Sequence, residues 1–476
     1  MNAENAHNPY HDYQKARQLA RQFEAMLAKT HTCFFSVDNF EYLLDYYQQH
    51  EIDNKKALLV LDYAIQQYPY SSQFHLKKVQ LLVEDNQYQK ALKYLHTCPI
   101  LLIDNNEVAA LEADIYCGLG RYSLALQKLR CLLLRSHSNE KADVYLFTAD
   151  LFDNLGQPTK AYRFIKHALK IAPCHEGALE RMAGLVSELG KQDEAIRIYH
   201  HLLDQNPYCH LVWYNLGTAY MEIGLYEKAI DAYEFVPAIL EDDEDAYRNI
   251  AICYMALEEY KLAENYFLLA MEYGEPDDEI WLLLGRCAMA LGNYQQAIQY
   301  AYKAELLATE PEEALFLQAQ GYEKEFAYTA ALQYCKKALQ IQPNNVQYLD
   351  YLAQLYTKMD LHKQVEGVYA QIVAIQPKNL QAWYNLAFWH YDFHNWQSCY
   401  QVIQKAMLIN NKLSADLLYL LAACCYRLNK TLEGYEYLHD ALSVNCHKYT
   451  LFFSLIPHLQ HNSSIMALIE DYLVCG

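Results

Sequence analysis

Two histidines are the first residues in the sequence that could support chemistry. His390 and His394 are four residues apart with Asp392 between them, so on a helix their imidazoles would share one face, as in half of a metal site. No third ligand stands at a suitable spacing. Both histidines also have a structural interpretation, because His390 occupies a position that is usually aromatic in this chain and His394 falls in a turn. We therefore expect packing roles rather than metal binding.

The 14 cysteines are the second candidate. They form no C-x-x-C pair, and three Cys-His dipeptides do not complete a four-ligand zinc set: Cys174-His175, Cys209-His210 and Cys446-His447. The sequence also lacks the glycine-rich loops that hold phosphates and the G-x-S-x-G motif of serine hydrolases. We therefore predict no catalytic residues, no metal site and no cofactor, and hence a protein that is not an enzyme.

Carboxylates are the third candidate, because the chain holds 58 Asp and Glu against 38 Lys and Arg, a formal net charge of −20. Residues 241–313 alone hold 17 acidic residues against four basic ones. Three acid clusters there each lie at the start of the first predicted helix of three successive repeat units, where carboxylates complement the positive end of the helix dipole. Because the clusters recur at one phase of a repeat, we also predict that they stack into an acidic docking ridge for a basic segment of a partner. This acidic ridge comprises Glu241, Asp242, Asp243, Asp277, Asp278, Glu279, Glu312 and Glu313.

The same composition excludes several other classes of function. An acidic chain is poorly suited to following a phosphate backbone, so nucleic acid is not an expected partner. The N-terminal residues show no basic region followed by an apolar stretch, and apolar runs such as Leu417 to Cys425 are too short to cross a bilayer. We therefore expect a cytoplasmic protein with reduced cysteines and no membrane insertion.

The elements that must position these residues come from an internal repeat of 34 residues. With Trp213 at position 4 of a unit, the same frame begins at residues 38, 72, 106, 142, 176, 210, 244, 278, 312, 346, 380 and 415. Small residues mark the frame most sharply. Alanine occupies position 20 in nine consecutive units, at Ala57, Ala91, Ala125, Ala161, Ala195, Ala229, Ala263, Ala297 and Ala331.

Each unit has the pattern of two helices. Positions 4, 7, 8 and 11 have helical spacing and give one apolar stripe, and positions 20, 24 and 27 give a second. Glycine is frequent at position 15, where the first helix must end, and proline is frequent at position 32, where the second ends. One pair of helices cannot bury both stripes, so neighbouring pairs must stack into a continuous core.

This pattern resembles the tetratricopeptide repeat (TPR) family. The resemblance covers residues 38–447 as twelve tandem units. It implies an all-α fold, a right-handed α-solenoid with a concave groove lined by the first helix of each pair. Residues 1–37 are expected to give a disordered start, over residues 1–10, and an N-terminal capping helix. Residues 448–476 are expected to give a degenerate C-terminal capping pair.

The resemblance also implies which positions of the first helix face the groove. Asparagine at position 6 could pair with the backbone amide of a bound peptide, since a carboxamide both donates and accepts, or it could be a common packing residue; both interpretations stay open. The lysine and asparagine set that binds chaperone tails in one part of the family does not occur in three consecutive units, whereas aromatic residues gather in the later units. The predicted peptide-binding residues are Tyr214, Asn215, Arg248, Asn249, Tyr351, Tyr384, Asn385, Phe388 and Tyr391.

Together these features favour a non-enzymatic scaffold or adaptor that binds a protein or peptide segment in its groove. The alternative is a receptor that senses a peptide and thereby controls an enzyme or a transcription factor. Whether the groove or the acidic ridge is the main binding surface stays open. Nothing in the sequence indicates self-association, although end caps and exposed aromatic residues could support it.

Overall fold

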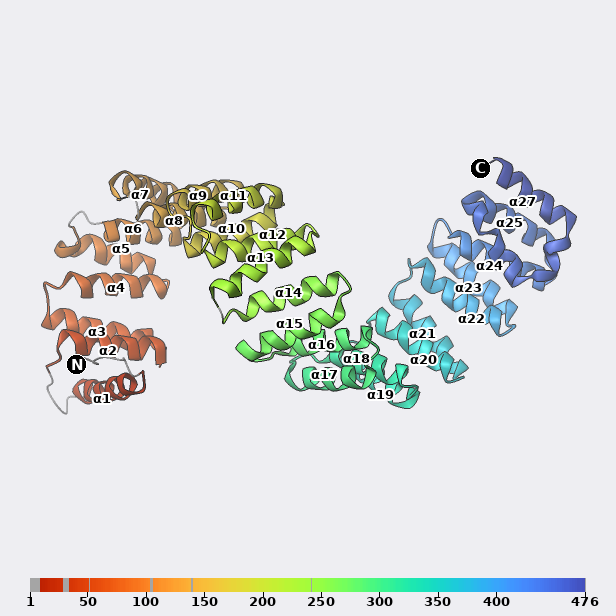
Figure 1. The fold of residues 1–476 in the computed structure, drawn as a ribbon, viewed down its shortest axis with the longest axis horizontal. Helices are drawn as coiled ribbons and strands as arrows, with labels where there is room; N and C mark the ends of the chain where they lie inside the picture. Colours follow the sequence, from red (N-terminus) through yellow and green to blue (C-terminus); the bar gives the residue numbers. More distant parts are fainter. Residues whose placement is uncertain are drawn as a thin grey trace. The chain divides into compact units, whose positions relative to one another are not determined.

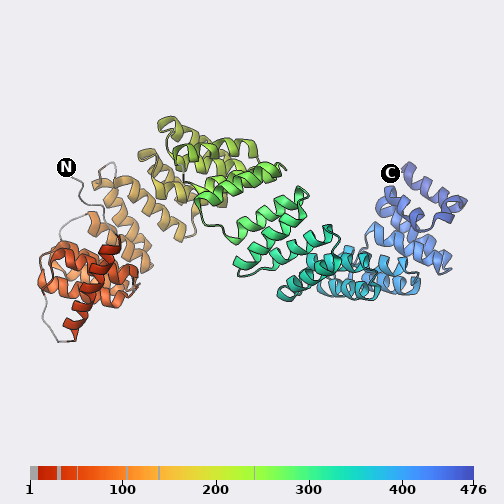
Figure 2. The same cartoon turned by 60° about the horizontal axis from the view of Figure 1, so that its bottom comes forward.

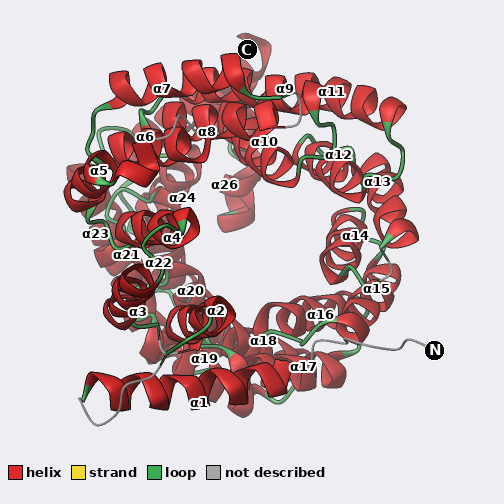
Figure 3. Ribbon diagram, turned by 90° about the vertical axis from the view of Figure 1, so that its left-hand side faces the viewer, coloured by secondary structure: helices red, strands yellow, loops and turns green. Residues whose placement is uncertain are grey.

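The computed structural model describes residues 9–28, 34–50, 52–102, 106–137, 140–240 and 242–475 (Figure 1). Within these ranges the regular elements are helices joined by short loops, and no strand occurs (Figure 3). The predicted all-α solenoid is therefore confirmed. Of residues 1–10, which the sequence predicts to be disordered, residues 1–8 lie outside the described ranges, and α1 begins at Pro9.

The chain folds as two compact units, Met1–Glu241 and Asp242–Gly476, a division that the repeat pattern does not predict. The first unit contains α1 (Pro9–Leu27), α2 (Val37–Asp45), α3 (Asn54–Gln67), α4 (Ser72–Glu84), α5 (Tyr88–Thr97), α6 (Asn106–Gly118), α7 (Tyr122–Arg135), α8 (Glu140–Asn154), α9 (Pro158–Ile171), α10 (Glu176–Leu189), α11 (Gln192–Gln205), α12 (His210–Glu222) and α13 (Tyr226–Ile239). A π-helical turn at Tyr46–His50 and a 3-10 turn at Pro99–Leu102 complete it.

The second unit contains α14 (Glu244–Ala256), α15 (Tyr260–Tyr273), α16 (Asp278–Ala290), α17 (Tyr294–Leu307), α18 (Glu312–Lys324), α19 (Tyr328–Ile341), α20 (Val346–Lys358), α21 (His362–Ile375), α22 (Leu380–Asp392), α23 (Trp396–Ile409), α24 (Ala415–Arg427), α25 (Thr431–Asn445), α26 (Tyr449–Leu455) and α27 (Ser463–Cys475). Two 3-10 turns, Cys446–Lys448 and Pro457–His461, flank α26.

Within each unit the helices alternate as first and second members of pairs (Figure 2). The second helix of one pair packs on its own first helix and also on the first helix of the next pair. In the second unit, for example, α17 contacts both α16 and α18. The small residues at position 20 lie in these contacts, and all nine alanines listed above are fully buried. A small side chain there lets neighbouring helices approach closely, which is why the pattern keeps alanine.

The turn between the two helices of a pair has one backbone conformation whichever residue occupies position 15. Gly120, Gly156, Gly190, Gly224 and Gly292 have positive φ, in the left-handed region. The units without glycine place another residue there with φ between 50° and 63°: Ile52, Asn86, Glu258, Phe326, Asp360, His394 and Asn429. A residue with a Cβ is strained in this region, least so for asparagine, so tertiary packing has imposed the turn on these units.

Substituting glycine at a strained turn is therefore expected to stabilise the protein. Phe326→Gly should raise the free energy of unfolding by about 1 kcal/mol, because the Phe326 side chain is mostly exposed and little packing is lost. Asn429→Gly is the matched control, with an expected gain of less than about 0.5 kcal/mol since asparagine tolerates the conformation. Urea unfolding of both variants checks the difference, and an equal effect of the two would contradict the strain.

Polar residues interrupt the apolar pattern in the unit that begins at residue 72, and the structure pairs them. His75 is buried, with Nδ1 2.6 Å from the Tyr94 hydroxyl and Nε2 3.0 Å from the carbonyl oxygen of Pro69. Lys78 Nζ donates to Asp62 Oδ1 at 2.5 Å. Because these polar groups are satisfied, α4 still packs on α3 and α5.

A buried carboxylate in the first unit links stability to pH. Glu112 on α6 accepts from Lys128 Nζ at 2.6 Å and from the Tyr116 hydroxyl at 3.2 Å, and His96 Nε2 lies 3.2 Å away. Burial by itself would raise the pKa of Glu112, but the bond from Lys128, followed by those from His96 and Tyr116, brings the pKa below its ordinary value of 4.5. A lowered folded-state pKa means that this stabilisation is present above pH 4.5 and is lost as the pH falls through the folded-state value.

Glu112→Gln should therefore be less stable than the parent protein by about 2 kcal/mol at pH 7, because Lys128 loses its buried partner. The difference should shrink steadily below pH 4.5, where the parent carboxylate becomes protonated. Thermal unfolding of both proteins between pH 3 and pH 7 measures it. A difference that is constant across this range would exclude the carboxylate as its cause.

Candidate binding surface on the first helices

Asparagine at position 6 occupies different environments in the two units. Asn215 on α12 is buried, and its Nδ2 donates to the carbonyl oxygen of Leu179 on α10 at 2.9 Å. This bond ties two consecutive first helices together. Asn385 on α22 is half-buried, and its Oδ1 accepts from Gln381 Nε2 at 2.9 Å. Asn249 on α14 is also half-buried. Peptide binding by these side chains stays a prediction, and in Asn215 one of the two carboxamide N–H groups is already engaged by Leu179.

The predicted aromatic residues also differ in how much of the side chain remains available. Tyr391 is buried, and its hydroxyl donates to the carbonyl oxygen of Leu455 at 3.0 Å, which fastens α22 to α26. The Tyr351 hydroxyl lies 2.9 Å from Glu323 Oε2 and 3.1 Å from the carbonyl oxygen of Ala319. Tyr384 and Phe388 stack on one face of α22, with ring centroids 5.7 Å apart, and Phe388 remains 37% exposed.

Tyr214 on α12 is half-buried in the first unit, and its ring meets the Tyr233 ring edge to face at 5.5 Å. In the second unit, the stacked rings of Tyr384 and Phe388 on α22 are the predicted aromatic residues best placed to contact a ligand, because Phe388 remains exposed.

Two members of the predicted acidic ridge are helix caps. Asp243 accepts from the backbone N–H of Ala246 at 2.9 Å, and Asp277 accepts from that of Ile280 at 2.8 Å. Such caps satisfy amide groups that a helix start would otherwise leave unpaired. Asp242 and Asp278 are exposed, and the described residues provide no ion pair for either of them. Glu241 lies outside the described residues.

Arginines link the acidic ridge from one first helix to the next. Arg248 on α14 reaches α16, where Nη2 lies 2.9 Å from Asp277 Oδ2 and Nη1 lies 3.7 Å from Glu279 Oε2. Its side chain is only 18% exposed. Arg286 on α16 reaches α18, where Nη2 lies 2.7 Å from Glu313 Oε2. The structure thus brings Arg248, predicted to bind a peptide, together with ridge carboxylates, so part of the ridge charge is neutralised internally.

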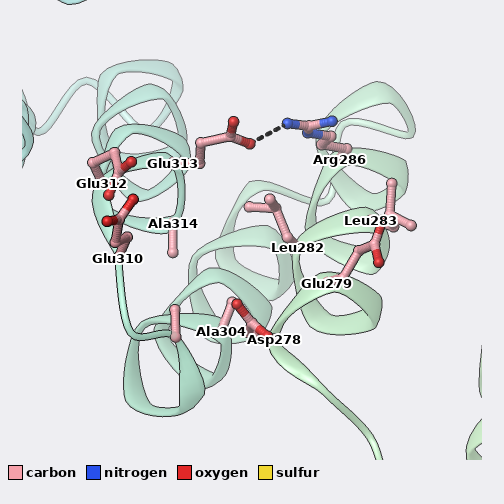
Figure 4. A pocket seen from close by; sticks show the side chains of 11 residues that line it. Asp278, Glu279, Leu282, Leu283, Arg286, Ala304, Glu310, Glu312, Glu313 and Ala314 are labelled. Atoms are coloured by element: carbon pink, nitrogen blue, oxygen red, sulfur yellow. Dashed lines mark hydrogen bonds and ion pairs between the residues drawn. The ribbon is translucent and has the colours of Figure 1, made fainter. Parts of the chain in front are cut away.

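A pocket of about 320 Å³ opens beside these arginine–carboxylate pairs, between α16 and α18 (Figure 4). Glu310 and Glu312 lie on one side, at the start of α18, and α16 supplies the other side with Leu282, Leu283 and Glu279. The remaining lining residues are Asp278, Arg286, Ala304, Ala308, Glu313 and Ala314. Five acidic residues and one arginine therefore line the pocket.

The negative potential extends to the next first helix. Burial, followed by the charges of Glu313 and Glu312, raises the pKa of Tyr348 on α20 to about 12. The sequence indicated the acid clusters, but it did not indicate the pocket. Its walls combine residues from α16, α17 and α18 that become neighbours only when the helices stack.

The histidines considered for metal binding lie in packing and turn positions. His390 is buried on α22, and burial lowers the pKa of its imidazole. His394 occupies the left-handed turn after that helix. In the described part of the chain, no group of three or more His, Cys, Asp or Glu side chains is arranged to hold a metal ion. None of the helices in that part combines the length and apolar character that crossing a membrane requires.

Comparison with known proteins finds one family model that matches part of the repeat region. Residues 186–238 and 248–311 match the family model described as tetratricopeptide repeat. No curated protein matches the chain.

Several solved structures are similar at low identity. The crystal structure of MamA is 23% identical over 34% of this chain and 95% of its own, with a TM-score of 0.33. That of YrrB, described as a TPR protein with an unusual peptide-binding site, is 18% identical over 39% and 95%, with a TM-score of 0.34. The pilF protein of Pseudomonas aeruginosa is 17% identical over 46% and 99%, with a TM-score of 0.39. At these values the function has to be argued from the residues of this chain.

Proposed function

We propose a function from one premise: this chain is a tetratricopeptide repeat protein. Proteins of this family generally mediate protein–protein interactions. We propose that the chain is a non-enzymatic scaffold that binds a segment of a partner protein on the first helices of its second unit. The observation that carries this proposal is the uncompensated acidity of that surface, where Asp242 and Asp278 are exposed without an ion pair among the described residues.

The partner segment that fits this surface is basic and extended. Successive first helices present carboxylates at the same end, so a chain running across them would meet one acidic site per repeat. The stacked Tyr384 and Phe388 add an apolar contact further along the same unit. A peptide-sensing receptor remains the alternative, and the twelve-unit division and a cytoplasmic location remain part of the proposal.

Charge reversal tests the acidic surface, provided that it avoids the helix caps. Asp242→Lys combined with Asp278→Lys should weaken partner binding about tenfold at low salt, with a smaller loss at high salt where surface charges are screened. The measurement is recovery of native partners from a lysate of the source organism, quantified by mass spectrometry at two salt concentrations.

Glu325→Lys combined with Glu436→Lys is the matched control. Both residues are exposed, and the double change alters net charge by the same amount away from the acidic ridge. The control should retain the partners of the parent protein. If both double variants recover the same partners with the same salt dependence, the partner does not bind the ridge.

A further inference from the structure

Two cysteines of the first unit lie in contact across consecutive repeats. Cys174 is in the turn before α10, and Cys209 directly precedes α12, a first helix that packs on α10. The thiol of Cys209 is hydrogen-bonded to that of Cys174. Asn206, at the start of the turn that holds Cys209, donates from Nδ2 to Cys174 Sγ at 3.1 Å. The sequence has these cysteines in two Cys-His dipeptides one repeat apart, and the structure brings their thiols together.

The histidine beside Cys174 is engaged elsewhere. His175 uses both ring nitrogens, because Nδ1 accepts from the backbone N–H of Ala178 at 3.3 Å and Nε2 lies 2.9 Å from Asp143 Oδ1. Both cysteines are free thiols. Oxidation to a disulfide is therefore the chemistry that the two contacting side chains share.

The two thiols differ in their access to solvent. Cys174 is exposed, whereas Cys209 is buried, with 6% of its surface exposed. Burial, followed by the hydrogen bond to Cys174, raises the pKa of the Cys209 thiol to about 12. A dissolved oxidant therefore meets the sulfur of Cys174 first, while Cys209 stays protonated beside it. One accessible thiol with an adjacent resolving thiol is the arrangement typical of reversible cysteine oxidation.

We propose that Cys174 and Cys209 form a site of reversible oxidation by a peroxide. The Cys174 thiolate attacks one oxygen of hydrogen peroxide and breaks the O–O bond, which gives a sulfenic acid and a hydroxide that takes up the proton released by the thiol. The Cys209 sulfur then attacks the Cys174 sulfur, and the hydroxyl group leaves as water with the Cys209 proton. The two thiols lose two electrons and two protons, and the peroxide is reduced to two molecules of water. A small-molecule or protein thiol reverses the reaction by exchange.

The disulfide would join two first helices that are linked by a hydrogen bond in the reduced protein, from Asn215 Nδ2 on α12 to the carbonyl oxygen of Leu179 on α10. A covalent bond between the turns that precede these helices restricts their separation, because it closes the loop of chain between Cys174 and Cys209. Oxidation thus restrains the part of the first unit that carries Tyr214 and Asn215. The proposal does not rest on the scaffold function, and its test needs no partner protein.

Mass spectrometry of the full-length protein tests the site. The reduced protein is treated with a small molar excess of hydrogen peroxide, and the remaining thiols are blocked with N-ethylmaleimide. Trypsin separates the two cysteines by cutting after Arg181, Lys191 and Arg197. The peptide linked between Cys174 and Cys209 should be about tenfold more abundant than any other linked pair, and dithiothreitol should remove it. Absence of this linked peptide, or an equal yield of other pairs, overturns the proposal.

Three variants separate the roles of the two thiols. Cys174→Ser, at an exposed position, should give no linked peptide. Cys209→Ala should keep the sulfenic acid on Cys174, detected as a dimedone adduct, because the resolving thiol is missing. Cys131→Ser is the matched control, since Cys131 is also exposed but lies on α7, and it should leave the linkage intact. Loss of the linkage in Cys131→Ser, or no dimedone adduct in Cys209→Ala, overturns the proposed order of steps.

Hydrogen exchange measures the consequence of oxidation. Backbone amides of α10 and α12 should exchange about tenfold more slowly in the oxidised protein than in the reduced one. Cys174→Ser, treated with peroxide in the same way, should show no change. Equal exchange in both forms of the parent protein overturns the restraint of the two helices by the disulfide.

Discussion

Replacing Phe267 with alanine is expected to lower the free energy of unfolding of the second unit by about 4 kcal/mol. Phe267 lies on α15 and is fully buried. It belongs to a cluster that joins three helices, with Ala251 on α14 and with Ile280 and Leu284 on α16. Removal of the ring leaves a cavity at the junction of two consecutive helical pairs, where neither pair can collapse without losing contacts to the other.

The loss should be local, because each pair in a solenoid is stabilised by its immediate neighbours. In Phe267→Ala, amide hydrogens of α14 and α15 should exchange faster than those of the later helices, and urea should unfold this pair first. Leu268→Ala is the matched control, because the adjacent side chain is partly exposed and its loss should cost less than about 1 kcal/mol. Equal costs for the two variants, or faster exchange spread evenly over the unit, would contradict this account of the core.

Asp277→Lys is expected to destabilise the second unit by about 3 kcal/mol, although the residue lies at the surface. Two contacts are lost together. The carboxylate caps α16 through the N–H of Ile280, and it bonds Arg248 Nη2 at 2.9 Å. Lysine also places a positive charge beside Arg248, whose buried Nε has no hydrogen-bond partner in the described part of the chain, and beside the positive end of the helix dipole.

Asp277→Asn separates the contribution of the helix cap from that of the charge. Asparagine keeps a capping oxygen but removes the charge, so about 1 kcal/mol should be lost. Asp278→Lys, one residue along, removes neither a cap nor an ion pair that the described residues show, and should cost less than about 0.5 kcal/mol. Thermal melts of the three variants measure the series. If Asp278→Lys costs as much as Asp277→Lys, net charge rather than the cap and the Arg248 bond controls stability.

The helix caps limit which acidic residues can be changed in a test of partner binding. A binding assay that reverses charge at Asp243 or Asp277 would mix partner recognition with local unfolding, because both residues cap helices. Asp242 and Asp278 separate the two effects. The distinction arises from hydrogen bonds that the acid clusters in the sequence do not reveal.

The sequence by itself determined the helical architecture. A 34-residue period with alanine at position 20 is a local property of the chain, and it specifies which face of each helix is apolar and small. The structure buries those alanines at the contacts between helices. The acid clusters could also be recognised from the sequence, because carboxylates at helix starts complement the positive end of the helix dipole.

Only the tertiary structure decided which side chains meet. The bond from Arg248 to Asp277 and that from Arg286 to Glu313 join residues almost one repeat apart, and the burial of Glu312 depends on how α18 stacks on its neighbours. Phe326 likewise adopts a left-handed backbone conformation that phenylalanine does not favour by itself. The division into two units between Glu241 and Asp242 is another feature that only the tertiary structure decides. The physical reason is that periodicity specifies each helix separately, whereas contacts between pairs depend on the spacing and rotation of the stack, which no single segment of the chain encodes.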